Sequence, residues 1–240
     1  MTSSPQRRPS PAALTATLCA LAAASTWVRR DYRAWKTLGV GGLPHSPRGW
    51  LTTTCLRLKT IDPLDVTGYG DDGDGRRTTG RLAELTYRNG PRPSVGHWPI
   101  PHRPVDQSVG TAMRHALEAV FGDAVAAHAN IATWQRSRLE GHCQAITLVD
   151  HETAPTDIRA TRGEIAHIHP GDGSMHLVLA APDARAVIEK SWGERHPLAG
   201  ATPQLPATYL LLYPPRDTAE LEAVAGILDA AVRHAAGLNR

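Results

Sequence analysis

The carboxy-terminal half of the chain has a regular pattern of apolar and polar positions. Residues 107–122 carry apolar side chains at helical spacing, and residues 131–139 and 143–149 alternate as strands. A second hairpin is predicted at 164–169 and 175–180, then a helix at 182–193, a buried strand at 208–215, and a final helix that Asp217 would cap. This order predicts an α+β fold, in which an antiparallel sheet of about five strands carries helices on one face.

The amino-terminal part has a different pattern. Residues 12–38 are helical in character, whereas residues 39–106 are rich in Pro and Gly and have little periodicity. Within that stretch, 49–58 is a short helix or strand and 68–80 an exposed loop. We therefore expect three regions: an amino-terminal helix at 1–38, an extended wrap at 39–106, and the α+β core at 107–240.

The first helix has more than one interpretation. Residues 12–28 carry no charge and are followed directly by Arg29 and Arg30. They could form an Ala-rich helix packed on the core, a membrane anchor, or a cleaved signal sequence. The expected location is accordingly cytoplasmic, or membrane-associated through residues 12–28.

Composition excludes some classes of function. The net charge is only +3, with no basic run interleaved with aromatic residues, so we expect no nucleic-acid partner. The three cysteines are widely spaced and form neither a disulfide framework nor a zinc motif. A small-molecule substrate is the expected partner.

The densest candidate chemistry lies in "EIAHIHPGDGSMH", residues 164–176. Side chains alternate along a strand, so His167 and His169 share one face. If His169 pairs with His176, all three imidazoles lie on the same side of the hairpin. They could bind a divalent metal, with Asp172 or Glu164 as a further ligand, act as metal-free acid–base or substrate-binding groups, or be structural.

Further candidates lie outside this hairpin. The segment "KSWGERHPLAG", residues 190–200, is expected to be a loop. It either brings functional side chains together or ends the preceding helix, with Trp192 in the core and Glu194 and Arg195 in salt bridges. In the Pro-rich wrap, His97, Trp98 and His102 could line a pocket, although surface packing is the more common role for such residues. The candidates in the 190–200 segment are Trp192, Glu194, Arg195 and His196.

Several of these stretches together resemble the fungal luciferases and their wider luciferase-domain family. The resemblance runs through "RRDYRAW" at 29–35, "SPRGWL" at 46–51, "GPRPSVGHWPIPHR" at 90–103 and "DQ" at 106–107. It is strongest at 163–200 and continues at 210–232. The turn "PGDGS" follows the wider family rather than the luciferases proper, and the Ala-, Arg- and Pro-rich composition is typical of a bacterial member.

The resemblance implies an oxygenase that adds O2 to a hydroxylated pyrone such as 3-hydroxyhispidin, with a peroxide that loses CO2 and emits light. It implies no flavin, haem or nucleotide, so O2 would be the only co-reactant unless the histidines hold a divalent metal. Catalysis would then fall to His167, His169, His176, Arg195 and His196. Glu164, Asp172, Trp192, Glu194, His97 and Trp98 would bind the substrate. The resemblance also implies a membrane-associated amino-terminal helix.

Overall fold

The computed structural model describes residues 10–69 and 80–238, and the chain divides after Leu38 into two compact units. The first contains one long helix, α1 (Pro11–Thr37), where the sequence predicts it. The Ser10 side chain accepts a hydrogen bond from the backbone N–H of Ala13, and Pro11 occupies the first turn. By length and composition α1 could cross a membrane, a test that a signal sequence near the amino terminus would also pass.

The second unit is built on one antiparallel sheet of six strands in the order β1-β2-β3-β4-β6-β5. The strands are β1 (Ala132–Arg136), β2 (Gln144–Leu148), β3 (Glu164–Ile168), β4 (Met175–Val178), β5 (Gly193–Arg195) and β6 (Tyr209–Leu212). The α+β prediction is confirmed. The additional strand is β5, which lies in the segment predicted to be a loop.

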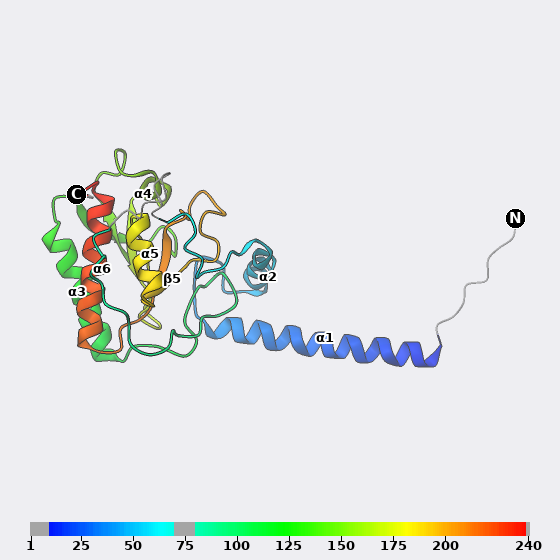
Figure 1. Cartoon of the computed structure of the whole chain (residues 1–240). Coiled ribbons are helices and arrows are strands. Elements are labelled where there is room, and N and C mark those ends of the chain that lie inside the picture. The colour runs from blue at the N-terminus through cyan, green and yellow to red at the C-terminus, as the bar shows by residue number, and fades with distance from the viewer. Residues whose placement is uncertain (1–9, 70–79, 239–240) are drawn as a thin grey trace, which may run out of the picture. The chain divides into compact units, whose positions relative to one another are not determined.

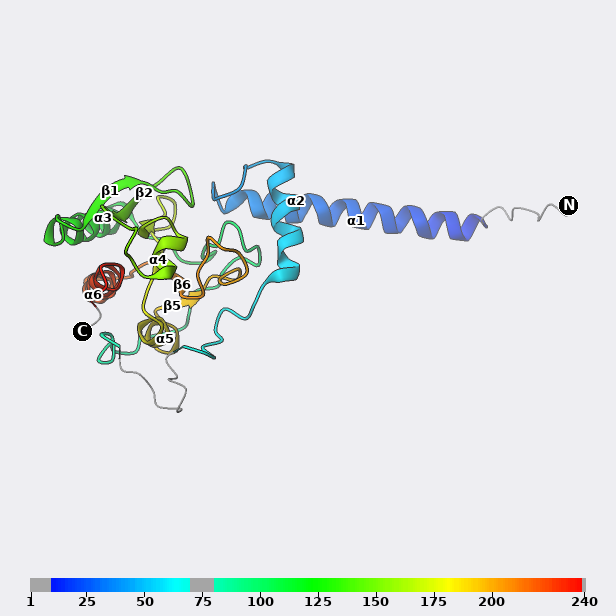
Figure 2. The ribbon, with the colours of Figure 1, turned by 90° about the horizontal axis from the view of Figure 1, so that it is seen from above.

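Three helices pack against one face of this sheet (Figures 1 and 2): α3 (Thr111–Ala127), α5 (Ala181–Glu189) and α6 (Thr218–Ala235). Leu117 and Phe121 of α3 and Val224, Ile227 and Leu228 of α6 form one apolar core with the strands. Asp217 caps α6 as predicted, because its carboxylate accepts the backbone N–H of Glu220. A short helix, α4 (Thr156–Ala160), occurs where only a polar loop was expected.

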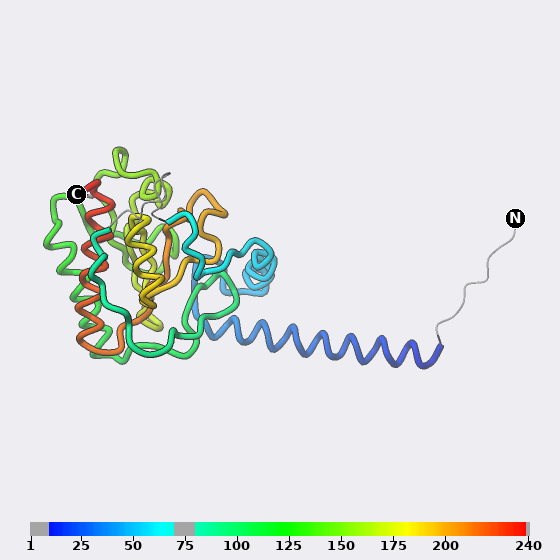
Figure 3. Tube along the Cα trace, viewed as in Figure 1, coloured from blue at the N-terminus to red at the C-terminus, as the bar shows by residue number. Residues whose placement is uncertain are grey.

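The Pro/Gly-rich segment belongs to the same compact unit as the sheet. The helical alternative is correct for its first part, α2 (Pro47–Leu56), which continues into a 3₁₀ turn, η1 (Arg57–Lys59). Residues 80–110 follow as an extended segment (Figure 3). Most of the predicted loop at 68–80 lies outside the described residues.

Candidate functional site

The β3–β4 hairpin sets the geometry of the site, and its register differs from the predicted one. His167 pairs with His176, and Ile168 with Met175, so the expected pairing of His169 with His176 is wrong. The error is two residues along the strand, which preserves the face of every side chain. His167, His169 and His176 consequently share one face, while Ala166, Ile168, Met175 and Leu177 face the helices.

The turn of this hairpin positions a partner for His169. Gly173 has φ of 78°, in the left-handed region that favours glycine, and a Cβ there would lie 2.5 Å from Val109 Cγ2. This tight turn brings the Ser174 hydroxyl to 2.7 Å from His169 Nδ1. Asp172 accepts the backbone N–H of Ser174 and lies 4.0 Å from the same imidazole nitrogen.

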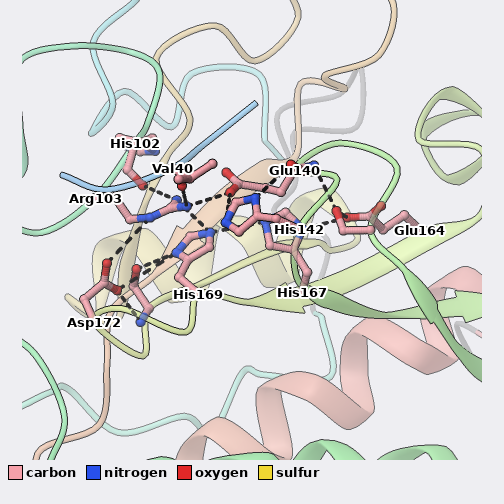
Figure 4. Close-up of polar contacts among 11 residues, drawn as sticks. Val40, His102, Arg103, Glu140, His142, Glu164, His167, His169 and Asp172 are labelled. Carbon is pink, nitrogen blue, oxygen red and sulfur yellow. Dashed lines mark hydrogen bonds and ion pairs between the residues drawn. The ribbon is translucent and has the colours of Figure 1, made fainter. Parts of the chain in front are cut away.

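A buried chain of polar contacts joins the hairpin to the neighbouring strands (Figure 4). Glu164 Oε1 lies 2.6 Å from His167 Nδ1, and His167 Nε2 lies 3.2 Å from His169 Nε2. Burial alone would raise the pKa of Glu164, but the bonds from His167, Ser137 and the backbone N–H of Arg138 outweigh burial and lower that pKa. The carboxylate is therefore charged and holds the His167 ring in place.

Arg103 is the buried cation of the site, at 3% exposure. Its guanidinium donates to His169 Nε2 at 2.8 Å and to Glu140 Oε2 at 2.7 Å, and lies 3.6 Å from Asp172 (Figure 4). Since arginine always donates, His169 Nε2 must be the acceptor and its Nδ1–H must face Ser174. Arg103 thus supplies a fixed positive charge beside the hairpin histidines.

A second imidazole–carboxylate pair lies nearby. His102 Nε2 is 2.8 Å from Glu194 Oε1, and Tyr213 donates its hydroxyl to Glu194 Oε2 at 2.8 Å. Glu194 belongs to the edge strand β5, whereas His102 comes from the Pro-rich segment. The extended segment therefore contributes side chains directly to the site.

The remaining two imidazoles have fixed and opposite tautomers. His176 Nδ1 donates to the carbonyl of Leu210 at 3.0 Å, which leaves a lone pair on Nε2. His196 Nδ1 accepts the backbone N–H of Leu198 at 3.0 Å, so a neutral His196 carries its hydrogen on Nε2. One ring offers an acceptor and the other a donor.

Burial keeps several of these rings neutral. It holds the pKa of His169, His176 and His196 well below the ordinary value, reinforced by Arg103 for His169, by His196 for His176 and by His102 for His196. Burial also raises the pKa of Tyr209, whose ring stacks on His176 with centroids 4.9 Å apart. At neutral pH these three imidazoles and the Tyr209 phenol are uncharged and act as hydrogen-bond donors and acceptors.

A cavity of about 340 Å³ opens onto this face of the sheet. His102, His176, His196 and Tyr209 line it from one side, and Pro99 and Ile100 of the Pro-rich segment from another. Small-molecule sites in proteins begin at about 300 Å³. The cavity is therefore large enough for a small aromatic ligand in contact with three imidazoles.

Two groups in the described part of the chain bring potential metal-ligand atoms within 4.8 Å of one another: Glu140, His167, His169 and His176; and His102, His176 and His196. In the first, Arg103 already binds Glu140 and His169, which places its positive charge where a cation would be held. In the second, the His196 tautomer leaves two imidazole lone pairs rather than the three that catalytic zinc sites commonly use.

Some predicted site residues lie elsewhere. Because 193–195 is a strand, Arg195 points away from Glu194, over the ring of Tyr69 at 5.1 Å and toward the carbonyl of Ala207. The Trp192 indole is buried and donates to the carbonyl of Thr86 at 2.7 Å, beside the Arg88 guanidinium. His97 and Trp98 contact each other and are not among the residues that line the cavity.

Other residues of the site were not predicted. Arg103, Glu140, Ser174, Tyr209 and Tyr213 join it, and His102, for which surface packing was favoured over lining a pocket, lines the cavity. The available signal was the pair His102–Arg103 inside a Pro-rich stretch with no pattern of its own. Charged and imidazole side chains in such a segment need hydrogen-bond or ion-pair partners from other parts of the fold.

Comparisons with known proteins identify relatives of this chain. The luciferase domain family matches residues 162–231, which include the hairpin, His196 and β6. The chain is 33% identical to a luciferase of Armillaria gallica over 91% of this chain and 87% of that protein. It is 32% identical to a luciferase of Neonothopanus nambi, over 85% of this chain and 80% of that protein. These relatives are fungal, and a bacterial origin stays a prediction.

No solved structure matches the chain. The evidence for its relationship is therefore the sequence identity, which extends over most of the chain rather than over the matched domain alone. The chain belongs to the luciferase-domain family.

Proposed function

We propose that this protein is a luciferase-type oxygenase that adds O2 to an enolic aromatic metabolite of the 3-hydroxyhispidin type. The observation that carries the proposal is the cavity beside His102, His176, His196 and Tyr209, in which the neutral rings of His176 and His196 meet a space the size of a small ligand. The relatives named luciferase support a light-emitting reaction of this kind.

The chemistry follows from the lone pairs and the fixed charge. A hydroxypyrone must lose its enol proton before it can react with O2, and a neutral imidazole lone pair can accept that proton. The electron pair stays on the substrate as an enolate, which the His196 Nε2–H would stabilise by hydrogen bonding. The buried charge of Arg103 lowers the energy of the anion further.

Oxygen then reacts with the enolate itself. The nucleophilic carbon forms a bond to O2, so the carbon is oxidised and the oxygen reduced to a peroxide anion. Closure of that anion onto the lactone carbonyl gives a strained peroxide, whose breakdown releases CO2. The protein's part is to take the proton, hold the anions and keep water out of the cavity.

A metal-dependent enzyme of another class is the second candidate. It is favoured by the approach of His167 Nε2 to His169 Nε2, 3.2 Å, at which two lone pairs would repel unless a proton or a cation lay between them. The proton is the simpler answer, because Glu164 holds the other side of His167 and Arg103 already supplies the charge. We therefore propose that O2 is the only co-reactant.

The test is oxygen consumption and light emission by the purified chain with 3-hydroxyhispidin, with metal content measured on the same sample. Turnover that a chelator does not change supports the proposal. No turnover with any hydroxypyrone contradicts it, and activity that a chelator removes and one divalent metal restores selects the second candidate.

A cavity variant sharpens that test. Thr202 lies at the lining and is partly exposed, so Thr202→Trp should raise KM for the substrate at least several-fold while the fold is kept. Thr52 is exposed on α2 and is not a lining residue, which makes Thr52→Trp the matched control with unchanged KM. Equal KM values for the two variants would place the substrate elsewhere.

The proposal extends to the amino-terminal helix. The apolar length of α1 supports membrane association of the enzyme, which suits an apolar aromatic substrate. The full chain should float with liposomes in a density gradient, and Leu18→Asp together with Leu21→Asp should abolish flotation. A wild-type chain that stays at the bottom of the gradient would refute membrane association without touching the oxygenase.

A further inference from the structure

His102 presents one buried nitrogen without a partner. The residue is 1% exposed and lines the cavity, and its Nδ1 has no hydrogen-bond partner among the residues that the structure describes. A buried polar atom of this kind costs free energy unless water or a ligand satisfies it. Nδ1 is therefore available for a hydrogen bond to a ligand.

The other nitrogen of the ring explains the state of the first. Glu194 accepts from His102 Nε2 at 2.8 Å, and the Tyr213 hydroxyl holds the second oxygen of the same carboxylate at 2.8 Å. The carboxylate fixes a hydrogen on Nε2, so in the neutral ring the lone pair lies on Nδ1. An imidazole oriented in this way by a carboxylate is the arrangement that activates general bases in hydrolases.

We infer that His102 is the catalytic general base of the proposed oxygenase, and that Glu194 and Tyr213 are its positioning residues. This inference rests on the proposed function and assigns one atom within it. The enol O–H bond breaks, its proton moves to His102 Nδ1, and the electron pair remains on the substrate oxygen as the enolate. Glu194 then balances the imidazolium charge.

The neighbouring imidazoles are less suited to this role. His176 also has a free lone pair, but its other nitrogen donates to a neutral carbonyl, so no carboxylate would balance a proton taken up there. His196 offers an N–H rather than a lone pair. His167 has a carboxylate partner, Glu164, yet its other nitrogen is 3.2 Å from His169 Nε2 and it does not line the cavity.

The charged and titratable groups facing His102 come from every side of the site. The carboxylate of Glu194 is on β5, the ring of His176 on β4 lies 5.5 Å away between centroids, and the ring of His196 lies 4.9 Å away. Arg103 follows in the chain and donates to the His102 carbonyl at 3.3 Å. Glu194 is the anion paired with the ring, so the acid limb of the pH profile should report on that contact.

The experiment compares oxygen consumption with 3-hydroxyhispidin across a pH series for the wild type and three variants. His102→Gln should lower kcat/KM by about 10²- to 10⁴-fold, the usual contribution of a general base. Tyr213→Phe should leave most of the rate but move the acid limb to higher pH, because a carboxylate freed from the phenol stabilises the imidazolium more strongly. A purely structural role for Tyr213 would not move that limb.

The matched control is His128→Gln. His128 Nε2 also pairs with a carboxylate, that of Asp229 at 3.0 Å, but the pair joins α3 to α6 away from the cavity. Its rate and pH profile should equal those of the wild type.

Two results would overturn the inference. The first is that the wild type turns over and His102→Gln has the same rate and the same acid limb. That result would leave the proposed function standing but would remove His102 as its base. The second applies if His102→Gln does not fold. An acid limb that does not move in Tyr213→Phe would then overturn the inference. A wild type that does not turn over removes the proposed function itself, and the inference with it.

Discussion

The two faces of the central sheet are built by the same strands and covered by different kinds of structure. On one face, regular helices bury Leu, Ile, Val and Phe side chains in a continuous apolar core. On the other, a segment with little regular structure covers histidines, carboxylates and tyrosines that are equally buried. Burial alone therefore does not distinguish scaffold from site, whereas the pairing of the buried polar groups does.

The covering elements explain the difference. A helix satisfies its own backbone and can offer an apolar stripe, so α3 and α6 need only apolar partners. An extended segment must find partners for its polar groups, and it carries His102 and Arg103 to Glu194, His169 and Glu140. The site thus forms where a segment that has no core of its own meets the polar face of the sheet.

The largest expected effect is on the polar face. Arg103→Met leaves Glu140 and Asp172 buried beside no cation, and breaking such a pair from one side costs about 3–5 kcal/mol in free energy of unfolding. Urea denaturation measures this loss. Arg195→Met is the control, since Arg195 lies on the opposite side of β5, and its loss should be under about 1 kcal/mol with oxygenase activity kept. Comparable losses would reverse the roles assigned to the two arginines.

On the apolar face the expected loss is similar in size but different in kind. Leu177 is 1% exposed between the sheet and the helices, and Leu177→Ala should lower the free energy of unfolding by about 2–5 kcal/mol. The folded fraction should keep the KM of the wild type. A raised KM with normal stability would mean that the two faces are coupled.

Acid should destabilise the polar face first. The folded-state pKa values of His169, His176 and His196 are depressed, so these rings are neutral in the fold and take up protons on unfolding. Stability is then present above the unfolded pKa of about 6.5 and is lost as pH falls below it, by up to about 1.4 kcal/mol per pH unit for each ring.

Urea midpoints between pH 7.5 and 5 measure this slope. Replacing one of the rings, as in His196→Asn, should reduce the slope by about one proton. A midpoint that does not change over this range would show that the imidazoles titrate in the folded protein as they do in the unfolded chain.

The smallest expected effect concerns the turn of the hairpin. Ser174→Ala removes the hydroxyl at 2.7 Å from His169 Nδ1 and should cost about 1 kcal/mol in unfolding free energy. The activity should fall only modestly, because Arg103 still fixes the other nitrogen of that ring. A loss of activity as large as that of Arg103→Met would place Ser174 in the chemistry itself.

The regular elements could be predicted because each has a period of its own. Apolar spacing located α3, α6 and every strand of the described sheet except β5. Strand alternation placed His167, His169 and His176 on one face even though the register was wrong by two residues. A register shift by an even number of residues leaves every side chain on the same face. The predicted face of the three histidines was therefore correct although the predicted pairing was not.

The parts of the site that could not be predicted depend on tertiary pairing. Nothing in the local sequence of the Pro-rich segment indicates that Arg103 would meet His169, 66 positions further along. A dense polar stretch suggested a loop around Arg195, whereas a three-residue strand turns alternate side chains apart, and Arg195 is not among the residues that line the cavity. Trp192 packs in the core for a similar reason, because its indole N–H donates to the backbone carbonyl of Thr86.

The most direct test of the account is whether the histidine face ionises an enol. An anaerobic absorbance titration of 3-hydroxyhispidin with the protein, at a pH below the pKa of the free enol, separates proton transfer from the later reaction with oxygen. We predict that the enolate spectrum grows with bound protein in the wild type and not in His102→Gln. A bound substrate that keeps the spectrum of the neutral enol in the wild type would contradict the account.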